Sequence, residues 1–481
     1  MDRMRNAVAV AVLLCIMPAT LPAGSADNAK AASLVGPWLG TLKAPPSTEL
    51  RIVFNITADS DGTLAATIDS LDQGASDIPV TRITFEKGRV TLESDSIQGR
   101  YEGTLSADGS QLDGQWMQSG ISLDLVMKRV KEAPKAQRPQ EPKKPYPYID
   151  EEVTYQNAKD AVTFAGTLTM PRTGGPFPAV LLITGSGSQD RDESVFGHRP
   201  FLILADYLTR RGIAVLRVDD RGVGGSRGDA SQATSEDFAR DVLAGVAYLK
   251  TRKEIDSKRI GLIGHSEGGS IAPLAATQSA DVAFIVLMAG TGVPGDKVLE
   301  GQIESLLKIS GAEQALIDSV LQDQRRVIEI VKHETDPNQA KVKIREIVTT
   351  SMAKLDEKRK AAVDYSDGAI DARVQAATSK WFRFFITHDP KETLRKVKCP
   401  VLAINGRVDM QVRAKENLPA IEQALREGGN THFTVKELPG LNHLFQTAKT
   451  GAIDEYARIE ETMSPLALKT VAEWIESQGD Q

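Results

Sequence analysis

The stretch IGLIGHSEGGSIAPLAA, residues 260–276, joins an apolar run to a segment of small residues through Gly264-His265-Ser266-Glu267-Gly268. A G-x-S-x-G pattern between a buried strand and a helix is typical of a nucleophile elbow, a sharp turn that exposes a serine. The flanking glycines leave room for the strand and the helix to approach each other. We therefore expect Ser266 to act as the nucleophile of an acyl-transfer reaction.

A serine nucleophile requires a general base, and the base requires an acid that orients it. After an elbow of this kind the acid and then the histidine follow at the carboxyl ends of later strands. Asp409 follows the apolar run VLAIN, and His443 follows the predicted strand HFTVKEL. We assign these two residues as acid and base, and Asp296, after an earlier strand, stays open as the alternative acid.

The other histidines fit the chemistry less well. His265 neighbours Ser266 in the sequence, but adjacent side chains diverge at a sharp turn, and His432 begins a strand. The chain has six histidines and none of them pairs at a spacing typical of zinc ligands. We expect no metal and no cofactor.

Acyl transfer also needs two N–H donors for the oxyanion that develops on the substrate. One is expected from the backbone of Glu267, directly after the nucleophile. The other is expected from the loop after AVLLI, where we choose the backbone of Ser186 because Thr184-Gly185 occupies the place of the usual His-Gly pair. In the next loop, residues 219–226, ion pairs and turns are expected to brace the backbone.

The elements that must position these residues form two patterns. Residues 33–129 alternate apolar and polar side chains in short runs between turns, which predicts an all-β domain, either a barrel or a sandwich. Its repeated glycine–aromatic pairs are interpreted as core packing rather than a carbohydrate platform. Residues 130–148 are rich in proline and charge and predict an extended linker.

Residues 149–481 instead contain near-continuous Val/Ile/Leu runs that alternate with helical stretches, which predicts a parallel sheet covered on both faces. Between about 296 and 395 this rhythm stops, and helix-period apolar residues predict an inserted helical cap. Trp381 and Phe385 near its end could line a substrate pocket or join the cap to the body, and both interpretations stay open.

Residues 1–26 are interpreted as a signal peptide, because Arg3 and Arg5 precede a short apolar run that ends in small residues. Export to the periplasm or the medium is expected, and no later segment is apolar enough to span a membrane. The mature chain would keep Cys399 alone, as a buried inert thiol. A net charge of −6 argues against nucleic acid as a partner.

Several segments together resemble a known family. TGSGSQDRDE, GLIGHSEGG, PVLAINGRVDMQV and LPGLNHLFQ are similar to secreted bacterial two-domain α/β-hydrolase esterases of the serine-aminopeptidase-like, or esterase D, type. The resemblance runs from about residue 164 to the C-terminus. It implies an α/β-hydrolase fold, hydrolysis of carboxylic esters, often with short acyl chains, and the triad Ser266, Asp409 and His443.

The sequence thus predicts an exported carboxylesterase with a Ser-His-Asp acyl-enzyme mechanism and a small ester as substrate. One alternative is a serine aminopeptidase or amidase that uses the same triad. Another, of a different class, is a polysaccharide-binding protein built on a hydrolase scaffold. The sequence does not determine the acyl length, the oligomeric state or the purpose of the β domain.

Overall fold

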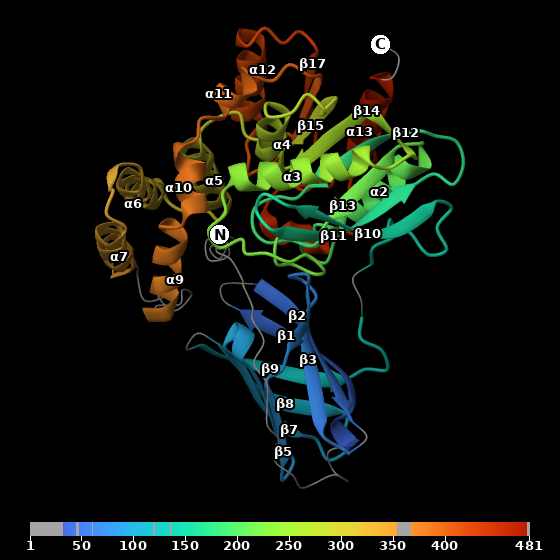
Figure 1. The fold of residues 1–481 in the computed structure, drawn as a ribbon. Coiled ribbons are helices and arrows are strands. Elements are labelled where there is room, and N and C mark those ends of the chain that lie inside the picture. The colour runs from blue at the N-terminus through green and yellow to red at the C-terminus, as the bar shows by residue number, and fades with distance from the viewer. Residues whose placement is uncertain are drawn as a thin grey trace. The chain divides into compact units, whose positions relative to one another are not determined.

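The structure is a computed structural model that describes residues 32–44, 48–59, 61–118, 121–134, 137–353 and 367–478. The chain divides into two compact units (Figure 1). The first comprises Met1–Gln137 with the short segments Ser310–Ala312 and Thr350–Ile370, and the second comprises Arg138–Ile309, Glu313–Thr349 and Asp371–Gln481. The expected signal peptide, residues 1–26, lies outside the described residues.

The first unit contains one antiparallel sheet of nine strands, in the order β4-β3-β2-β1-β9-β8-β7-β6-β5. The first strand pairs with the last, so that two meanders meet along β1 and β9. The sheet forms a half-barrel, which confirms the all-β domain expected from the sequence and favours the barrel over the sandwich. The strands are β1 (Gly36–Ala44), β2 (Thr48–Ala58), β3 (Leu64–Ser70), β4 (Ala75–Pro79), β5 (Arg82–Glu86), β6 (Arg89–Ser94), β7 (Gly99–Leu105), β8 (Gln111–Gln118) and β9 (Ile121–Arg129).

Aromatic side chains fill the concave side of this sheet. Trp38, Tyr101 and Trp116 are buried, and Tyr101 meets Phe54 edge to face with ring centroids 5.0 Å apart. A side chain at Gly99 would lie 2.4 Å from the Trp116 ring, which is why a glycine occupies that position. The glycine–aromatic pairs therefore serve core packing, as the sequence predicts.

The second unit is built on a mixed sheet of eight strands, in the order β10-β11-β13-β12-β14-β15-β16-β17. Strands β12 to β17 run parallel, but β10 and β11 are antiparallel to their neighbours, so the expectation of a wholly parallel sheet is wrong at this edge. The strands are β10 (Ile149–Asn157), β11 (Val162–Met170), β12 (Phe177–Ile183), β13 (Ala214–Val218), β14 (Ile255–His265), β15 (Phe284–Met288), β16 (Val401–Gly406) and β17 (Phe433–Leu438).

Helices cover both faces of this sheet, as the buried strands require. Apolar residues of α3 (Ser235–Lys250), α4 (Gly268–Ala276) and α12 (Ala414–Glu427) form one core with one face. Residues of α2 (Pro200–Arg210) and α13 (Pro465–Ser477) form a second core with the other face. This arrangement is the α/β-hydrolase architecture that the sequence predicts.

The interval between β15 and β16 is helical in its described part, where the sequence places a cap. Its helices are α5 (Gly295–Ile309), α6 (Gln314–His333), α7 (Pro337–Ala353), α9 (Asp367–Ala377), α10 (Lys380–Thr387) and α11 (Pro390–Leu394). Arg413, at the start of α12, binds Glu304 of α5 with an Nη2–Oε2 distance of 2.8 Å. This ion pair joins the insertion to the body of the second unit.

The second half of the predicted linker is held against the second unit. The Arg138 guanidinium donates to the backbone carbonyls of Gly197 and Ala457, both at 2.9 Å, and the Gln140 side chain contacts the backbone around Met463. Residues from Arg138 onward therefore do not act as a free spacer. Cys399 is half-buried, and burial raises the pKa of its thiol to about 11.

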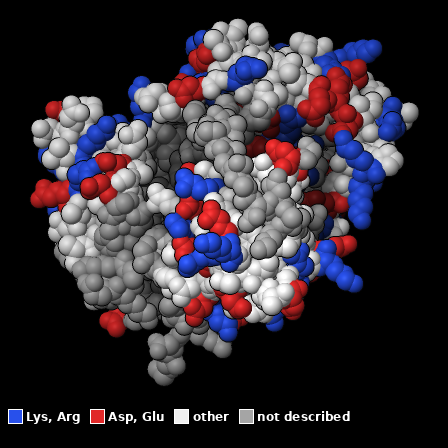
Figure 2. Space-filling model, turned by 90° about the horizontal axis from the view of Figure 1, so that it is seen from below, with Lys and Arg blue, Asp and Glu red and all other residues white. Residues whose placement is uncertain are grey.

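The described residues contain no helix long and apolar enough to cross a membrane, and no group of three or more His, Cys, Asp and Glu side chains that could hold a metal ion. Acidic and basic side chains are interspersed on the face of the molecule shown in Figure 2.

Candidate active site

Ser266 stands at the end of β14, in the turn that leads to α4. Its φ is +54°, a left-handed conformation that is costly for serine, at about 1–3 kcal/mol. The turn is held by a 2.8 Å hydrogen bond from the Ser266 amide to the Met288 carbonyl. A side chain at Gly264 would lie 1.9 Å from the Gly268 carbonyl oxygen, and one at Gly268 would lie 2.2 Å from the carbonyl oxygen of Ile183. The glycines are thus required by a strained turn of the kind the motif predicts.

Asp409 and His443 are brought together at the carboxyl ends of the neighbouring parallel strands β16 and β17. Nδ1 of His443 lies 2.8 Å from Oδ2 of Asp409, and both side chains are almost completely buried. The other carboxylate oxygen accepts the amides of Gln411 and Val412 at 2.8 and 2.9 Å. The acid is therefore held rigidly while it orients the imidazole.

The alternative assignments lie elsewhere. Asp296 is in α5 and forms an ion pair with Lys332 of α6 at 2.8 Å. His432 is exposed just before β17. His265 contacts Glu193 through Nδ1 and the His443 carbonyl through Nε2, so both of its nitrogens are already engaged. Asp409 is therefore the acid that the fold pairs with His443.

The two expected oxyanion donors lie in loops on either side of the nucleophile. Ser186 follows Gly185, where an added side chain would lie 3.3 Å from Cβ of Ser266. This distance places the loop after β12 directly beside the elbow. Among the described residues, the amides of Ser186 and Glu267 donate to no other backbone or side-chain oxygen. Both N–H groups are therefore available to a substrate oxygen.

The side chain of Glu267 joins the elbow to α3 and to the cap. One carboxylate oxygen accepts the Ser235 hydroxyl and the indole N–H of Trp381, each at 2.7 Å. Burial raises the pKa of Glu267, and these two donors partly offset that effect.

Trp381 and Phe385 lie on α10 of the cap. Their rings are stacked with centroids 5.6 Å apart and an interplanar angle of 5°. Both side chains keep some accessible surface. The Trp381 indole donates to Glu267, the residue after Ser266, so it attaches the cap to the elbow. This contact supports the interpretation that Trp381 joins the cap to the body, and it also places the indole close to the candidate site.

Two further carboxylates contact the loop after β12, in contacts that the sequence did not predict. Glu193 accepts the Gly185 amide at 2.8 Å, and Asp220 accepts the Thr184 hydroxyl at 2.9 Å. Burial raises the pKa of Asp220 to about 7, with help from the charges of Glu267 and Glu193. The acidic pattern QDRDE is the signal that pointed to this loop, but the contacts depend on the tertiary fold.

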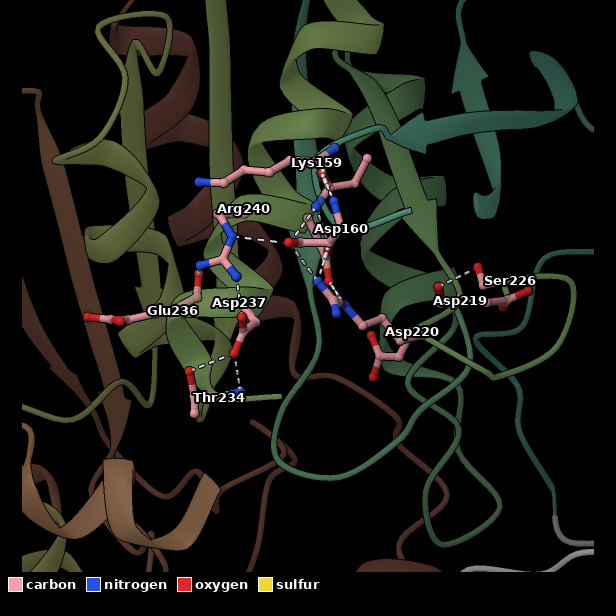
Figure 3. A network of polar contacts seen from close by, with 12 residues as sticks. Lys159, Asp160, Asp219, Asp220, Ser226, Thr234, Glu236, Asp237 and Arg240 are labelled. Atoms are coloured by element: carbon pink, nitrogen blue, oxygen red, sulfur yellow. Dashed lines mark hydrogen bonds and ion pairs between the residues drawn. The ribbon is translucent and has the colours of Figure 1, made fainter. Parts of the chain in front are cut away.

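The loop after β13 is braced by ion pairs and turns, as the sequence predicts. Ser226 donates to the Asp219 carbonyl at 2.7 Å (Figure 3). Arg221 of the loop forms an ion pair with Asp160 at 3.1 Å, and Asp160 also pairs with Arg240 of α3 at 3.1 Å. Thr234 closes a capping box with Asp237 at the start of α3. The network fixes the loop that carries Asp220.

The chain was compared with known proteins. The family model described as X-Pro dipeptidyl-peptidase (S15 family) matches residues 160–437, which include Ser266 and Asp409. Esterase EstD of Thermotoga maritima is 27% identical over 299 residues, which cover 62% of this chain and 61% of that protein. Esterase FrsA of Yersinia pestis is 34% identical over 128 residues, or 26% of this chain and 28% of that protein.

The chain thus spans less than two thirds of the length of these relatives. Among solved structures, Est1E from Butyrivibrio proteoclasticus, with bound ferulic acid, is 18% identical with a TM-score of 0.40 and is covered completely by 68% of this chain. The family model extends over more than half of the chain, from the first strands of the sheet past the elbow to β17. The protein is therefore a member of the X-Pro dipeptidyl-peptidase (S15) family of α/β-hydrolases.

Proposed function

We propose that the protein is a carboxylesterase that hydrolyses short-chain acyl esters through Ser266, His443 and Asp409. The observation that carries the proposal is the 2.8 Å contact between His443 and Asp409, with the His443 ring centroid 4.8 Å from that of His265, the residue directly before Ser266. Ser266 itself has a φ of +54°, as in a nucleophile elbow. An accessible, strained serine and an oriented imidazole are what nucleophilic acyl transfer requires. The similarity to esterases supports it.

The reaction follows from these positions. Oγ of Ser266 attacks the ester carbonyl while Nε2 of His443 takes the hydroxyl proton. The carbonyl oxygen becomes negative and is met by the amides of Ser186 and Glu267. The imidazolium, oriented by Asp409, gives its proton to the departing alcohol, and a water molecule then frees the acyl group by the same steps in reverse order.

A peptidase that uses the same triad is the second candidate, because the matching family model carries the name X-Pro dipeptidyl-peptidase. A peptidase that binds a free amino terminus needs an acidic group that is not already paired. The acidic side chains near the elbow are engaged, since Asp192 pairs with Arg217, Glu193 with His265 and Glu267 with Trp381. This pairing favours an ester substrate.

The test is a comparison of substrates on one enzyme. A fluorophosphonate probe should label the wild type and not Ser266→Ala, whereas Ser270→Ala, a nearby serine of α4 bonded to Thr291, should still be labelled. Short nitrophenyl esters should exceed aminoacyl and X-Pro nitroanilides in kcat/KM by at least about a hundredfold, or about 3 kcal/mol. Equal or faster nitroanilide cleavage would establish the peptidase instead.

We also propose that the protein is exported, which rests on the charged and apolar pattern of residues 1–26 alone. Mass spectrometry of the native protein should find a first residue between about 24 and 30. Recovery of the chain with Met1 intact would contradict export by this route.

A further inference from the structure

We infer that Glu193 and His265 form a buried pair that positions the oxyanion loop and the general base relative to each other. Glu193 lies in the loop between β12 and α2, and His265 is the last residue of β14. Their side chains are only 3% and 7% exposed, so neither is free to meet a substrate directly. The inference rests on the proposed function and assigns both as positioning residues.

The hydrogen bonds of this pair reach three parts of the site. Oε1 of Glu193 accepts the Gly185 amide and faces Nδ1 of His265, both at 2.8 Å. Nε2 of His265 lies 2.9 Å from the backbone carbonyl of His443. Gly185 precedes the expected oxyanion donor, and His443 is the expected base, so one carboxylate–imidazole unit connects both to the strand that carries the nucleophile.

The partners of His265 are both acceptors. The backbone carbonyl of His443 only accepts, so it needs a donor at Nε2, and a carboxylate oxygen of Glu193 faces Nδ1. Burial lowers the pKa of His265, but the charge and hydrogen bond of Glu193, together with the charge of Asp409, raise it overall. The His443 ring, with its centroid 4.8 Å away, also faces it. The two acceptors and the raised pKa thus favour donation by both nitrogens of His265.

The backbone conformation of Glu193 agrees with a positioning role. Its φ is +53°, in the left-handed region that non-glycine residues adopt only when their surroundings impose it. The backbone conformation of Glu193 is therefore locally unfavourable, but it places one carboxylate oxygen within hydrogen-bonding distance of both Gly185 and His265. A substitution that keeps the size of Glu193 but removes its charge isolates this effect.

The experiment compares Glu193→Gln with the full-length wild type on a short nitrophenyl ester. A glutamine can accept the Gly185 amide, but it removes the carboxylate charge that raises the pKa of His265 and so weakens donation by its second nitrogen. We expect kcat to fall roughly 10- to 100-fold with KM nearly unchanged, because the catalytic groups shift out of position while substrate binding is retained. As the pH rises, the activity of the wild type should fall when His265 loses a proton. In Glu193→Gln this fall should occur at a lower pH, because the charge that raises the pKa of His265 is gone.

The controls separate positioning from simple destabilisation. Val471→Ala removes buried apolar atoms of α13 in the core that this helix forms with α2, and should lower the melting temperature while leaving the pH profile unchanged. His265→Gln, the second variant, should also lower kcat. It should abolish the fall in activity at alkaline pH that is caused by deprotonation of His265. It serves in place of Glu193→Gln if that variant does not fold.

The inference is overturned if either variant keeps the wild-type kcat and alkaline profile, or if its lost rate only matches its lost folded fraction. Failure of the proposed function would look different, because the wild type itself would then show no fluorophosphonate labelling at Ser266. A labelled, active wild type with an unaffected Glu193→Gln variant refutes the positioning role alone.

Discussion

Asp220 provides a test of whether burial keeps a carboxyl group near the candidate site protonated. Its carboxylate accepts the Thr184 hydroxyl and the Gln189 amide, and burial raises its pKa to about 7. The folded protein thus keeps a proton that the unfolded chain loses near its ordinary pKa of 3.8. Stability from this group is complete below about pH 4 and is lost as the pH rises toward about 7.

The size of the effect follows from that difference. A shift from 3.8 to about 7 corresponds to about 4 kcal/mol at about 1.4 kcal/mol per pH unit. Asp220 keeps some accessible surface as a residue although its carboxyl group is enclosed, so this figure is an upper bound. Asp220→Asn resembles the protonated acid at every pH and should not lose this stability.

Urea unfolding of the wild type and Asp220→Asn between pH 4 and pH 8 measures the difference, in which the contributions of all shared groups cancel. As the pH rises, the free energy of unfolding of Asp220→Asn should increase by at least about 2 kcal/mol relative to that of the wild type, with most of the change between about pH 4 and pH 7. Val471→Ala, which removes no titratable group, should give a curve parallel to the wild type. If the Asp220→Asn curve is also parallel, the carboxyl group is charged at neutral pH and the reasoning is wrong.

Three substitutions test the proposed triad, and one tests the cap. Ser266→Ala and His443→Ala should lower kcat for a nitrophenyl ester by roughly four to six orders of magnitude, and Asp409→Asn by roughly four. Asp296→Asn is the matched control, and an inactive Asp296→Asn beside an active Asp409→Asn would reverse the assignment of the acid. Trp381→Phe keeps an aromatic ring but removes the hydrogen bond to the elbow. The preference among acyl lengths, measured as kcat/KM, should change while the melting temperature stays nearly the same. An equal loss of kcat/KM on all esters with a lowered melting temperature would indicate packing alone.

The elbow and its partners could be predicted because each depends on a short stretch of sequence. The glycines around Ser266 report a close approach of strand and helix, and Asp409 and His443 each follow an apolar run. The hydrogen bond between them is the consequence of β16 and β17 being parallel neighbours, a pairing that places their carboxyl ends at one edge. Local pattern and fold class together were sufficient here.

The contacts of Glu193, Asp220 and Glu267 could not be read in the same way. Glu193 and His265 are separated by 72 positions, and Glu267 and Trp381 by 114, with no periodicity that relates them. The antiparallel strands β10 and β11 were missed for another reason: β10 is mostly exposed or partly exposed and carries no continuous apolar run, and the apolar content of β11 does not reveal its direction. These features depend on loops and pairings that only the tertiary fold specifies.

The three buried carboxylates raise a question of electrostatics, because a negative charge near the oxyanion would oppose the reaction. Each is compensated in a different way: Glu193 faces Nδ1 of His265, the pKa of Asp220 is raised to about 7, and Glu267 accepts the Ser235 hydroxyl and the Trp381 indole N–H. Charges count for more in a site that excludes water, so this compensation is a condition for the oxyanion to form. The same compensation agrees with the proposed ester substrate, because a peptidase that binds a free amine would need one of these groups to be unpaired.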